Sequence, residues 1–290
     1  MNPKFTMSFQ VRYYECDAYN HVNHANYVRY MSEAAFGAAA AVGYGQNYLD
    51  TTGHVWLARE HDIEFIRPLT YGDVVHISTW VADFRRVRSL RKYEFWRGEE
   101  LVARASTDWV FINTNTQQLA FVPAEVAAAF EAKNGILEET AREDFPKPAP
   151  YAPEVFTGYY PVEWRDIDPQ FHVNNAAYLA YIENCNIDVC AHYGWPMDRM
   201  AAEGIGIIAR RYQIEYRRPA VLGDTLKIST WVSDRRGASA IRHHEIRRAA
   251  DDQLLVRSRV QWVWINLQTG APIRIPKPFL EAFADNFTEE

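Results

Sequence analysis

Cysteine is scarce in this 290-residue sequence, and no long hydrophobic run interrupts it. Three cysteines, Cys16, Cys185 and Cys190, are too few for a disulfide framework and lack the spacing of zinc ligands. The longest uncharged apolar stretch, around residues 34–42, is far shorter than the roughly 20 residues that a transmembrane helix needs. The first ten residues also lack the apolar core of a signal peptide, so we expect a cytoplasmic protein with no membrane partner.

Positive charge is also limited. The chain has 31 Lys and Arg against 37 Asp and Glu, which gives a formal net charge of −6. A mildly acidic chain is a poor candidate for non-specific nucleic-acid binding, so we expect no nucleic-acid partner. The content of 48% hydrophobic and 23% charged residues is typical of a globular chain, and the length suits about two domains.

The chain contains one pattern twice. The segment VRYYECDAYNHVNHANYVRY, which starts at Val11, aligns without a gap with VEWRDIDPQFHVNNAAYLAY, which starts at Val162. A repeat of this length indicates a duplicated domain. We predict an N-terminal domain at residues 1–130 and a C-terminal domain at 159–290. A proline-rich, semi-extended linker at 131–158 would join them.

Each repeat begins with the pattern of a strand followed by a helix. Apolar residues alternate with polar ones around residues 9–13, and again around 160–164, which indicates a half-buried strand. Asn23 and Asn174 are good N-caps for the helix that follows. The first helix is apolar nearly all round over residues 34–42, so we expect protein to enclose it.

Four β-rich segments follow each predicted helix. They lie near residues 56–67, 73–83, 88–97 and 101–113, and near 207–217, 224–234, 239–249 and 254–266. An Arg-Pro-x-x-x-Gly-Asp segment predicts a turn between the first two strands of each set. One long helix against an antiparallel meander predicts an α+β layer with a strongly curved sheet.

The loop before each helix carries Asp-x-x-x-His-Val-Asn, at residues 17–23 and 168–174. This motif, followed by a buried helix and Pro-x-x-x-Gly-Asp, resembles the hotdog-fold thioesterases of the 4-hydroxybenzoyl-CoA and plant acyl-ACP types. The resemblance covers residues 8–130 and 159–284. It implies a tandem (double) hotdog fold, in which each curved antiparallel sheet wraps a long central helix and the two sheets lie side by side.

Thioester hydrolysis needs only a base or nucleophile and a stabilised oxyanion, because the thioester is already activated. A carboxylate before a helix can supply the first. The backbone N–H groups of the first helical turn, residues 24–26 and 175–177, can supply the second. The resemblance places the catalytic aspartate of the family on Asp17 and on Asp168, as general base or nucleophile. It implies an acyl-CoA or acyl carrier protein thioester as substrate, and no cofactor beyond the coenzyme A or phosphopantetheine of that substrate.

One position departs from the plant acyl-ACP pattern, Asp-x-Asn-x-His-Val-Asn-Asn. Tyr19 and Gln170 stand where that pattern has its first asparagine. The departure argues against a mechanism in which that asparagine orients the water. The second repeat matches the pattern better through Asn174 and Asn175, so Asp168 is the better candidate if one site alone is active.

The motif and its surroundings supply the remaining candidates. The catalytic candidates are Asp17, His21, Asn23, Asp168, His172 and Asn174; the substrate-binding candidates are His24, Tyr27, Asn175, Tyr178, Arg85, Arg86, Arg235 and Arg236. Purely structural roles for these residues stay open. The histidines could hold the loop, the tyrosines could be core packing, and the arginine pairs, which could meet phosphates, could be solvated strand ends. We expect no metal, because the histidine pair of the first loop is not repeated in the second.

Two other functions compete with hydrolysis. A hotdog enoyl-thioester hydratase or dehydratase has its Asp and His five residues apart in Asp-x-Asn-Pro-x-His, whereas here they are four apart without Asn-Pro. A non-catalytic acyl-CoA-binding protein would not need the motif twice. We therefore expect two sites at the interface between the repeats, with Asp17 and Asp168 as their bases. Further homo-oligomerisation of the tandem unit stays open.

Overall fold

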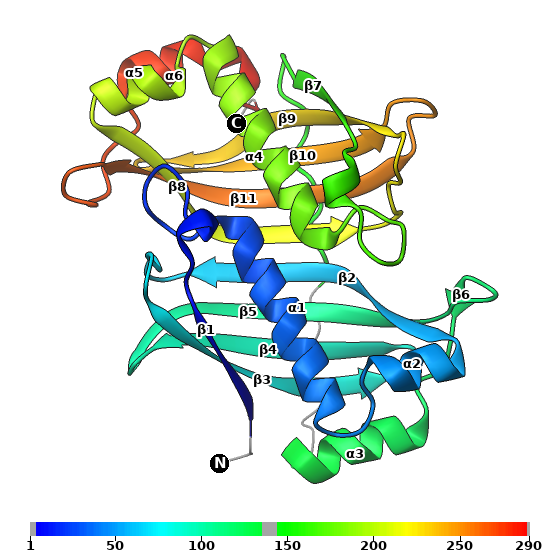
Figure 1. The fold of residues 1–290 in the computed structure, drawn as a ribbon. Helices are drawn as coiled ribbons and strands as arrows, with labels where there is room; N and C mark the ends of the chain where they lie inside the picture. Colours follow the sequence, from blue (N-terminus) through cyan, green and yellow to red (C-terminus); the bar gives the residue numbers. More distant parts are fainter. Residues whose placement is uncertain (1–3, 135–143, 289–290) are drawn as a thin grey trace. The chain divides into compact units, whose positions relative to one another are not determined.

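The chain folds into two compact units. The computed structural model describes residues 4–134 and 144–288. Unit 1 comprises Met1–Asp144, and unit 2 comprises Phe145–Glu290 (Figure 1).

In unit 1 a long helix lies across one face of a five-stranded antiparallel sheet (Figure 1). Its elements are β1 (Phe5–Gln10), α1 (His24–Ala40), α2 (Gln46–Thr52), β2 (His54–Phe65), β3 (Val74–Arg85), β4 (Arg88–Arg97), β5 (Glu100–Asn113), β6 (Gln118–Leu119) and α3 (Ala124–Asn134). The strands pair in the order β1-β3-β4-β5-β2, with β6 added to β5. The β2 strand thus pairs with β5 and not with β3. The predicted turn is present, since the Asp73 N–H donates to the Thr70 carbonyl at 3.1 Å, but it lies in a connection that crosses the sheet and does not close a hairpin.

Unit 2 repeats this topology. Its elements are β7 (Phe156–Pro161), α4 (Asn175–His192), α5 (Met197–Ala202), β8 (Ile205–Tyr216), β9 (Thr225–Arg236), β10 (Ser239–Arg248), β11 (Leu254–Asn266) and α6 (Lys277–Ala282). The pairing order is β7-β9-β10-β11-β8. The eight long strands begin and end within two residues of the predicted segments. The sequence did not predict the short helices α2, α3, α5 and α6.

The first strand of each unit ends earlier than predicted. The β1 strand ends at Gln10 and β7 at Pro161. Tyr13 and Trp164, which continue the apolar alternation, lie in short 3-10 turns and are 78% and 69% exposed. The alternation is misleading here because these aromatic side chains point into solvent and not into the sheet's buried face.

The expectation that protein encloses the first helix is wrong. One stripe of α1, at Arg29, Glu33, Phe36 and Ala40, is exposed at steps of three and four residues. The opposite stripe, which includes Met31, Ala34 and Ala38, is buried. Alanine suits either environment, so the run of alanines did not reveal which side faces the sheet.

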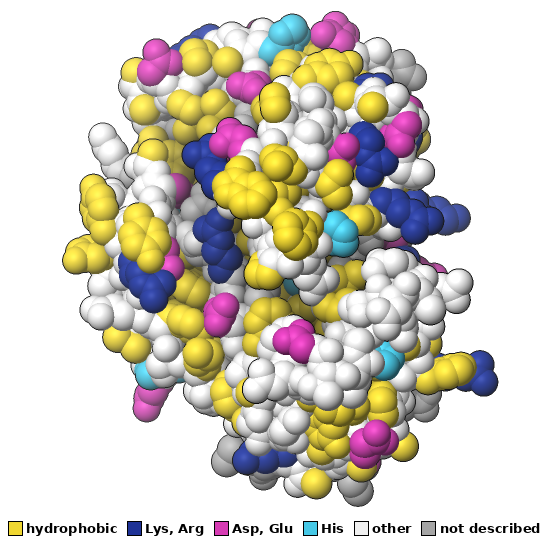
Figure 2. All heavy atoms as spheres, turned by 45° about the vertical axis from the view of Figure 1, so that its right-hand side comes forward, with side chains coloured by type: hydrophobic (Ala, Val, Ile, Leu, Met, Phe, Trp, Pro, Cys, Tyr) yellow, Lys and Arg dark blue, Asp and Glu magenta, His cyan; other side chains and the backbone are white. Residues whose placement is uncertain are grey.

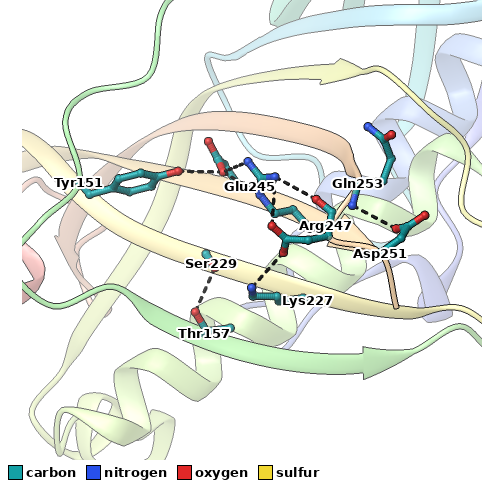
Figure 3. A network of polar contacts seen from close by, with 9 residues as sticks. Tyr151, Thr157, Lys227, Ser229, Glu245, Arg247, Asp251 and Gln253 are labelled. Carbon is teal, nitrogen blue, oxygen red and sulfur yellow. Dashed lines mark hydrogen bonds and ion pairs between the residues drawn. The ribbon is translucent and has the colours of Figure 1, made fainter. Parts of the chain in front are cut away.

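The C-terminal part of the predicted linker packs onto unit 2. The Tyr151 hydroxyl donates to Glu245 Oε2 at 3.0 Å (Figure 3). The Tyr151 ring centroid lies 4.7 Å from that of Trp231. Arg247 donates to the same carboxylate at 3.0 Å. The other end of the predicted linker, residues 131–134, belongs to α3, and residues 135–143 lie outside the described part of the chain.

We predict that Ile182→Ala destabilises the protein much more than Ile187→Ala does. Both residues lie on α4, but Ile182 is fully buried and Ile187 is 40% exposed. Loss of a buried isoleucine costs about 2–5 kcal/mol, whereas an exposed position costs about 0.5 kcal/mol. Denaturant unfolding of both variants checks this. Equal losses would contradict the observed orientation of α4.

Burial lowers the pKa of three histidines in the cores. The pKa falls to about 3 for His61 and to about 4 for His243, and it lies well below the usual value for His244. Each ring shares a hydrogen bond with a hydroxyl; the His243 Nε2 atom lies 2.8 Å from Ser233 Oγ. The folded protein therefore holds these rings neutral, while the unfolded chain takes up protons below pH 6.5.

Stability should accordingly be complete above pH 6.5 and fall as the pH drops below it. Each histidine contributes about 2 kcal/mol of this loss between pH 7.5 and pH 5. We expect His243→Gln to lose about 2 kcal/mol less over this range than wild type, as measured by urea unfolding at both pH values. The control His192→Gln changes a half-exposed imidazole and shows whether the effect requires burial. An unchanged pH dependence in His243→Gln would contradict the prediction.

Candidate functional site

Asp17 lies in a tight loop just before α1. Its Oδ1 atom accepts the backbone N–H of Tyr19 at 2.8 Å and that of His21 at 3.2 Å. Its own N–H donates to the His21 carbonyl at 2.8 Å, and Asn20 at the tip adopts a φ of 61°. One carboxylate oxygen thus fixes the loop, as aspartate side chains commonly do in turns. The other oxygen has no hydrogen bond within the described part of the chain and can accept one from a ligand or water.

Asp168 occupies the equivalent loop before α4. Its Oδ1 atom accepts the Gln170 N–H at 2.9 Å, and its N–H donates to the His172 carbonyl at 2.9 Å. Phe171 at the tip has a φ of 62°. Asp168 Oδ1 accepts one backbone N–H where Asp17 Oδ1 accepts two, but in both repeats one carboxylate oxygen is committed to the loop.

Asn23 and Asn174 are the predicted N-caps. Asn23 Oδ1 accepts the Ala25 N–H at 3.0 Å, and Asn174 Oδ1 accepts the Ala176 N–H at 2.9 Å. The next N–H, that of Ala177, donates to the Asn174 carbonyl. These bonds correct the expectation that three N–H groups stand ready for an oxyanion. In unit 2 the Asn175 N–H is the one in this turn without a hydrogen bond to the described residues.

A carboxylate that the sequence analysis passed over anchors the junction in unit 1. Glu15 is buried, and its Oε2 atom accepts the Tyr30 hydroxyl at 2.6 Å and the Arg12 N–H at 2.8 Å. The Glu15 carbonyl accepts the N–H of the N-cap Asn23 at 2.9 Å. Glu15 therefore joins the strand end, the loop and the helix.

Unit 2 has the same anchor with a shorter acid. The Tyr181 hydroxyl donates to Asp166 Oδ2 at 2.6 Å, and the Asp166 carbonyl accepts the Asn174 N–H at 2.8 Å. Burial, helped by the neighbouring carboxylate, raises the pKa of Tyr30 and of Tyr181 above the usual range, so both hydroxyls stay protonated donors. The signal was available in the sequence, because both tyrosines and both acids recur at the repeat offset.

Tyr27 and Tyr178 are core residues. They are 2% and 1% exposed, and the Tyr178 hydroxyl accepts the Ala220 N–H at 2.9 Å. The Tyr27 ring centroid lies 5.0 Å from that of Phe65 and 5.4 Å from that of Phe95. Burial raises the pKa of both tyrosine hydroxyls. We therefore assign packing to these tyrosines in place of substrate binding, and Tyr178 also holds the crossover segment against the helix.

The other loop candidates lie near the aspartates. The His24 ring packs edge-on to Phe65, with 5.3 Å between ring centroids. The carbonyl of Asn175 accepts the Tyr216 hydroxyl at 3.0 Å. The side chains of His21 and His172 are half-buried and make no hydrogen bond to the described residues. Their catalytic role stays a prediction.

The structure does not bring the arginine candidates to the aspartate loop of their own unit. Arg85 and Arg86 lie at the β3–β4 hairpin, and Arg235 and Arg236 lie at the β9–β10 hairpin. The aspartate loops meet the other end of these strands, through bonds such as Val11 N–H to the Asp73 carbonyl. Strands of this length span roughly 35 Å. Arg85 contacts Asp83, and Arg235 lies over the Phe287 ring. A role of these arginines in phosphate binding stays a prediction.

Neither metal ligation nor membrane spanning finds support in the described residues. Within residues 4–134 and 144–288, no three His, Cys, Asp or Glu side chains are grouped as they would be around a metal ion. In the same two ranges no helix combines the length and the apolarity needed to cross a bilayer.

Residues 11–130 and 162–283 both match the sequence model of the Thioesterase-like superfamily. These two matches cover most of the chain and follow its two repeats, and they carry the hotdog α+β fold that the motif predicted. The chain therefore belongs to the Thioesterase-like superfamily.

Named relatives support this assignment. A chloroplastic palmitoyl-acyl carrier protein thioesterase of Gossypium hirsutum is 25% identical over 275 residues, which cover 89% of this chain and 63% of that protein. This chain thus spans less than two thirds of the relative's length. An acyl-CoA thioester hydrolase of Escherichia coli is 28% identical over 122 residues, or 42% of this chain and 90% of that protein. A 12:0-ACP thioesterase of Umbellularia californica shares the fold, with a TM-score of 0.69, 22% identity and coverage of 89% of this chain and 93% of that one.

We predict that Tyr181→Phe destabilises unit 2 by about 1–3 kcal/mol, because it leaves the Asp166 carboxylate without its hydroxyl donor. The matched control is Tyr159→Phe, in which the altered tyrosine is 61% exposed and the expected change is below about 0.5 kcal/mol. Urea unfolding measures both changes. Equal stability of the two variants would show that the Asp166–Tyr181 bond does not anchor the junction.

Proposed function

We propose that this protein hydrolyses acyl thioesters. The observation that carries the proposal is the junction described above: an aspartate with one uncommitted carboxylate oxygen, held just before a capped helix N-terminus. Both repeats build this junction with a corresponding N-cap bond and a corresponding bond from the aspartate N–H to the histidine carbonyl. The superfamily membership of both repeats, and the names of the relatives, support the same activity.

The Asp168 carboxylate acts as the general base in this proposal. Its Oδ1 atom is fixed by the loop, so the other oxygen takes a proton from water as that water attacks the thioester carbonyl. The Asn175 N–H, at the positive end of the α4 dipole, donates to the developing oxyanion. The C–S bond then breaks, the carboxylic acid is released, and the proton passes from Asp168 to the leaving thiolate.

The substrate is an acyl group carried on a pantetheine thiol. The relatives named above act on acyl carrier protein and on acyl-CoA thioesters, and the pantetheine arm is common to both carriers. Asp17 offers the same chemistry in unit 1. Asp168 is the better candidate for a single working site, because Asn174 and Asn175 both follow its loop.

The test is thiol release from short, medium, long and aryl acyl-CoAs and from the matching acyl carrier protein thioesters. We expect Asp168→Asn to lower the rate by two to four powers of ten if unit 2 alone works, because the variant removes the general base. If both units work independently, each of Asp168→Asn and Asp17→Asn keeps about half the rate, and the double variant loses activity.

Two further outcomes limit the proposal. Release of no thiol from any thioester by the wild type would contradict hydrolysis. Conversion of an enoyl thioester to a hydroxyacyl thioester without thiol release would instead identify a hydratase. A control variant, Asp198→Asn, alters an aspartate outside both loops, on α5, and should leave the rate unchanged.

A further inference from the structure

Phe171 combines an unfavourable backbone with an unfavourable side-chain position. Its φ of 62° lies in the left-handed region, where a bulky side chain is strained. Its side chain is 72% exposed. Neither property helps the chain to fold, since the backbone favours glycine or asparagine here and water disfavours an exposed phenyl ring.

The other residues with this backbone show what the position ordinarily accepts. Five non-glycine residues of the described chain have positive φ, and the other four are Asn20, Gln117, Asp234 and Asp252. Asn20 is the direct counterpart of Phe171 at the tip of the first loop, with a φ of 61°. Unit 2 thus has a strained aromatic residue where unit 1 has an asparagine that suits this backbone.

Exposure alone would not distinguish Phe171. Large apolar side chains reach the surface at many places, and Figure 2 shows several among charged groups on one face. Phe121 is also 72% exposed. Strain that folding does not require occurs mainly at functional sites, and Phe171 is the exposed aromatic residue that carries it.

The backbone of Phe171 lies next to the proposed general base. Phe171 precedes His172, and its N–H donates to the Asp168 carbonyl at 2.9 Å. A thioester whose carbonyl is attacked by water from Asp168 therefore lies close to this tip. We infer that Phe171 is a substrate-contacting residue that covers the apolar acyl group next to the thioester carbonyl. This inference rests on the proposed hydrolysis for the identity of the ligand.

The test separates binding from turnover. The probe is S-decyl-coenzyme A, a thioether that cannot be hydrolysed, with S-methyl-coenzyme A as the short-chain reference. Calorimetry on the full chain gives both dissociation constants. We expect Phe171→Asn to raise the dissociation constant of S-decyl-coenzyme A by about tenfold, a free-energy loss typical of one apolar contact. The dissociation constant of S-methyl-coenzyme A should stay unchanged.

The same variant should be more stable than wild type. Asparagine relieves the backbone strain, so the Tm should rise by about 2 °C. A purely structural role for Phe171 would instead give weaker folding with unchanged binding. Phe121→Asn is the matched control, because it removes an equally exposed phenyl ring from unit 1 and should change neither dissociation constant.

Several results would overturn the inference. Unchanged binding of S-decyl-coenzyme A by Phe171→Asn is one, and absence of probe binding by the wild type is another. If the binding of both probes is weakened equally, the ring contacts the coenzyme and not the acyl group. Thiol release from decanoyl-CoA is measured separately on the wild type. If binding depends on Phe171 but no thiol is released, the proposed hydrolysis fails and the contact stands.

Discussion

The peptide carbonyl of one acidic residue in each unit fixes the geometry on which the proposed site depends. The Glu15 carbonyl in unit 1 and the Asp166 carbonyl in unit 2 each accept the N–H of the asparagine that begins the long helix. The side-chain carboxylates of the same two residues accept the hydroxyl of a tyrosine further along the same long helix, Tyr30 in unit 1 and Tyr181 in unit 2. This pair of bonds ties the start of the helix to the end of the preceding turn. The aspartate loop between them has little freedom left.

This constraint explains why the loop can tolerate sequence change. The two loops read DAYNH and DPQFH, yet both close with a bond from the aspartate N–H to the histidine carbonyl. Tyr178 holds the crossover segment of unit 2, because its hydroxyl accepts the Ala220 N–H. A rigid frame of buried bonds thus leaves the loop tip as the variable position, where unit 1 has Asn20 and unit 2 has Phe171.

Local signals in the sequence predicted much of this architecture. The eight long strands follow from runs of β-branched and aromatic residues, and both N-caps follow from an asparagine before a helical pattern. Because the chain contains the pattern twice, each strand and each N-cap was predicted independently in both units. The hotdog fold and the aspartate loops came from a motif whose residues are contiguous in the chain.

Long-range pairing explains what the sequence did not show. Nothing local to the Arg-Pro-x-x-x-Gly-Asp segment shows that β2 pairs with β5, so the predicted turn did not reveal that the chain crosses the sheet there. The sequence also does not show which end of a strand meets the aspartate loop, so the arginine pairs stood as either phosphate ligands or solvated strand ends. The anchoring bonds of Glu15 and Asp166 were not predicted, because their tyrosine partners lie 15 residues away, on the helix.

The central claim is that a thioester binds with its reacting carbon between the Asp168 carboxylate and the Asn175 N–H. A crystal structure of the full chain with S-decyl-coenzyme A tests this most directly. The account predicts that the thioether sulfur lies within about one water molecule's width of the Asp168 carboxylate, with the decyl chain against Phe171. A sulfur bound away from both aspartate loops would contradict it.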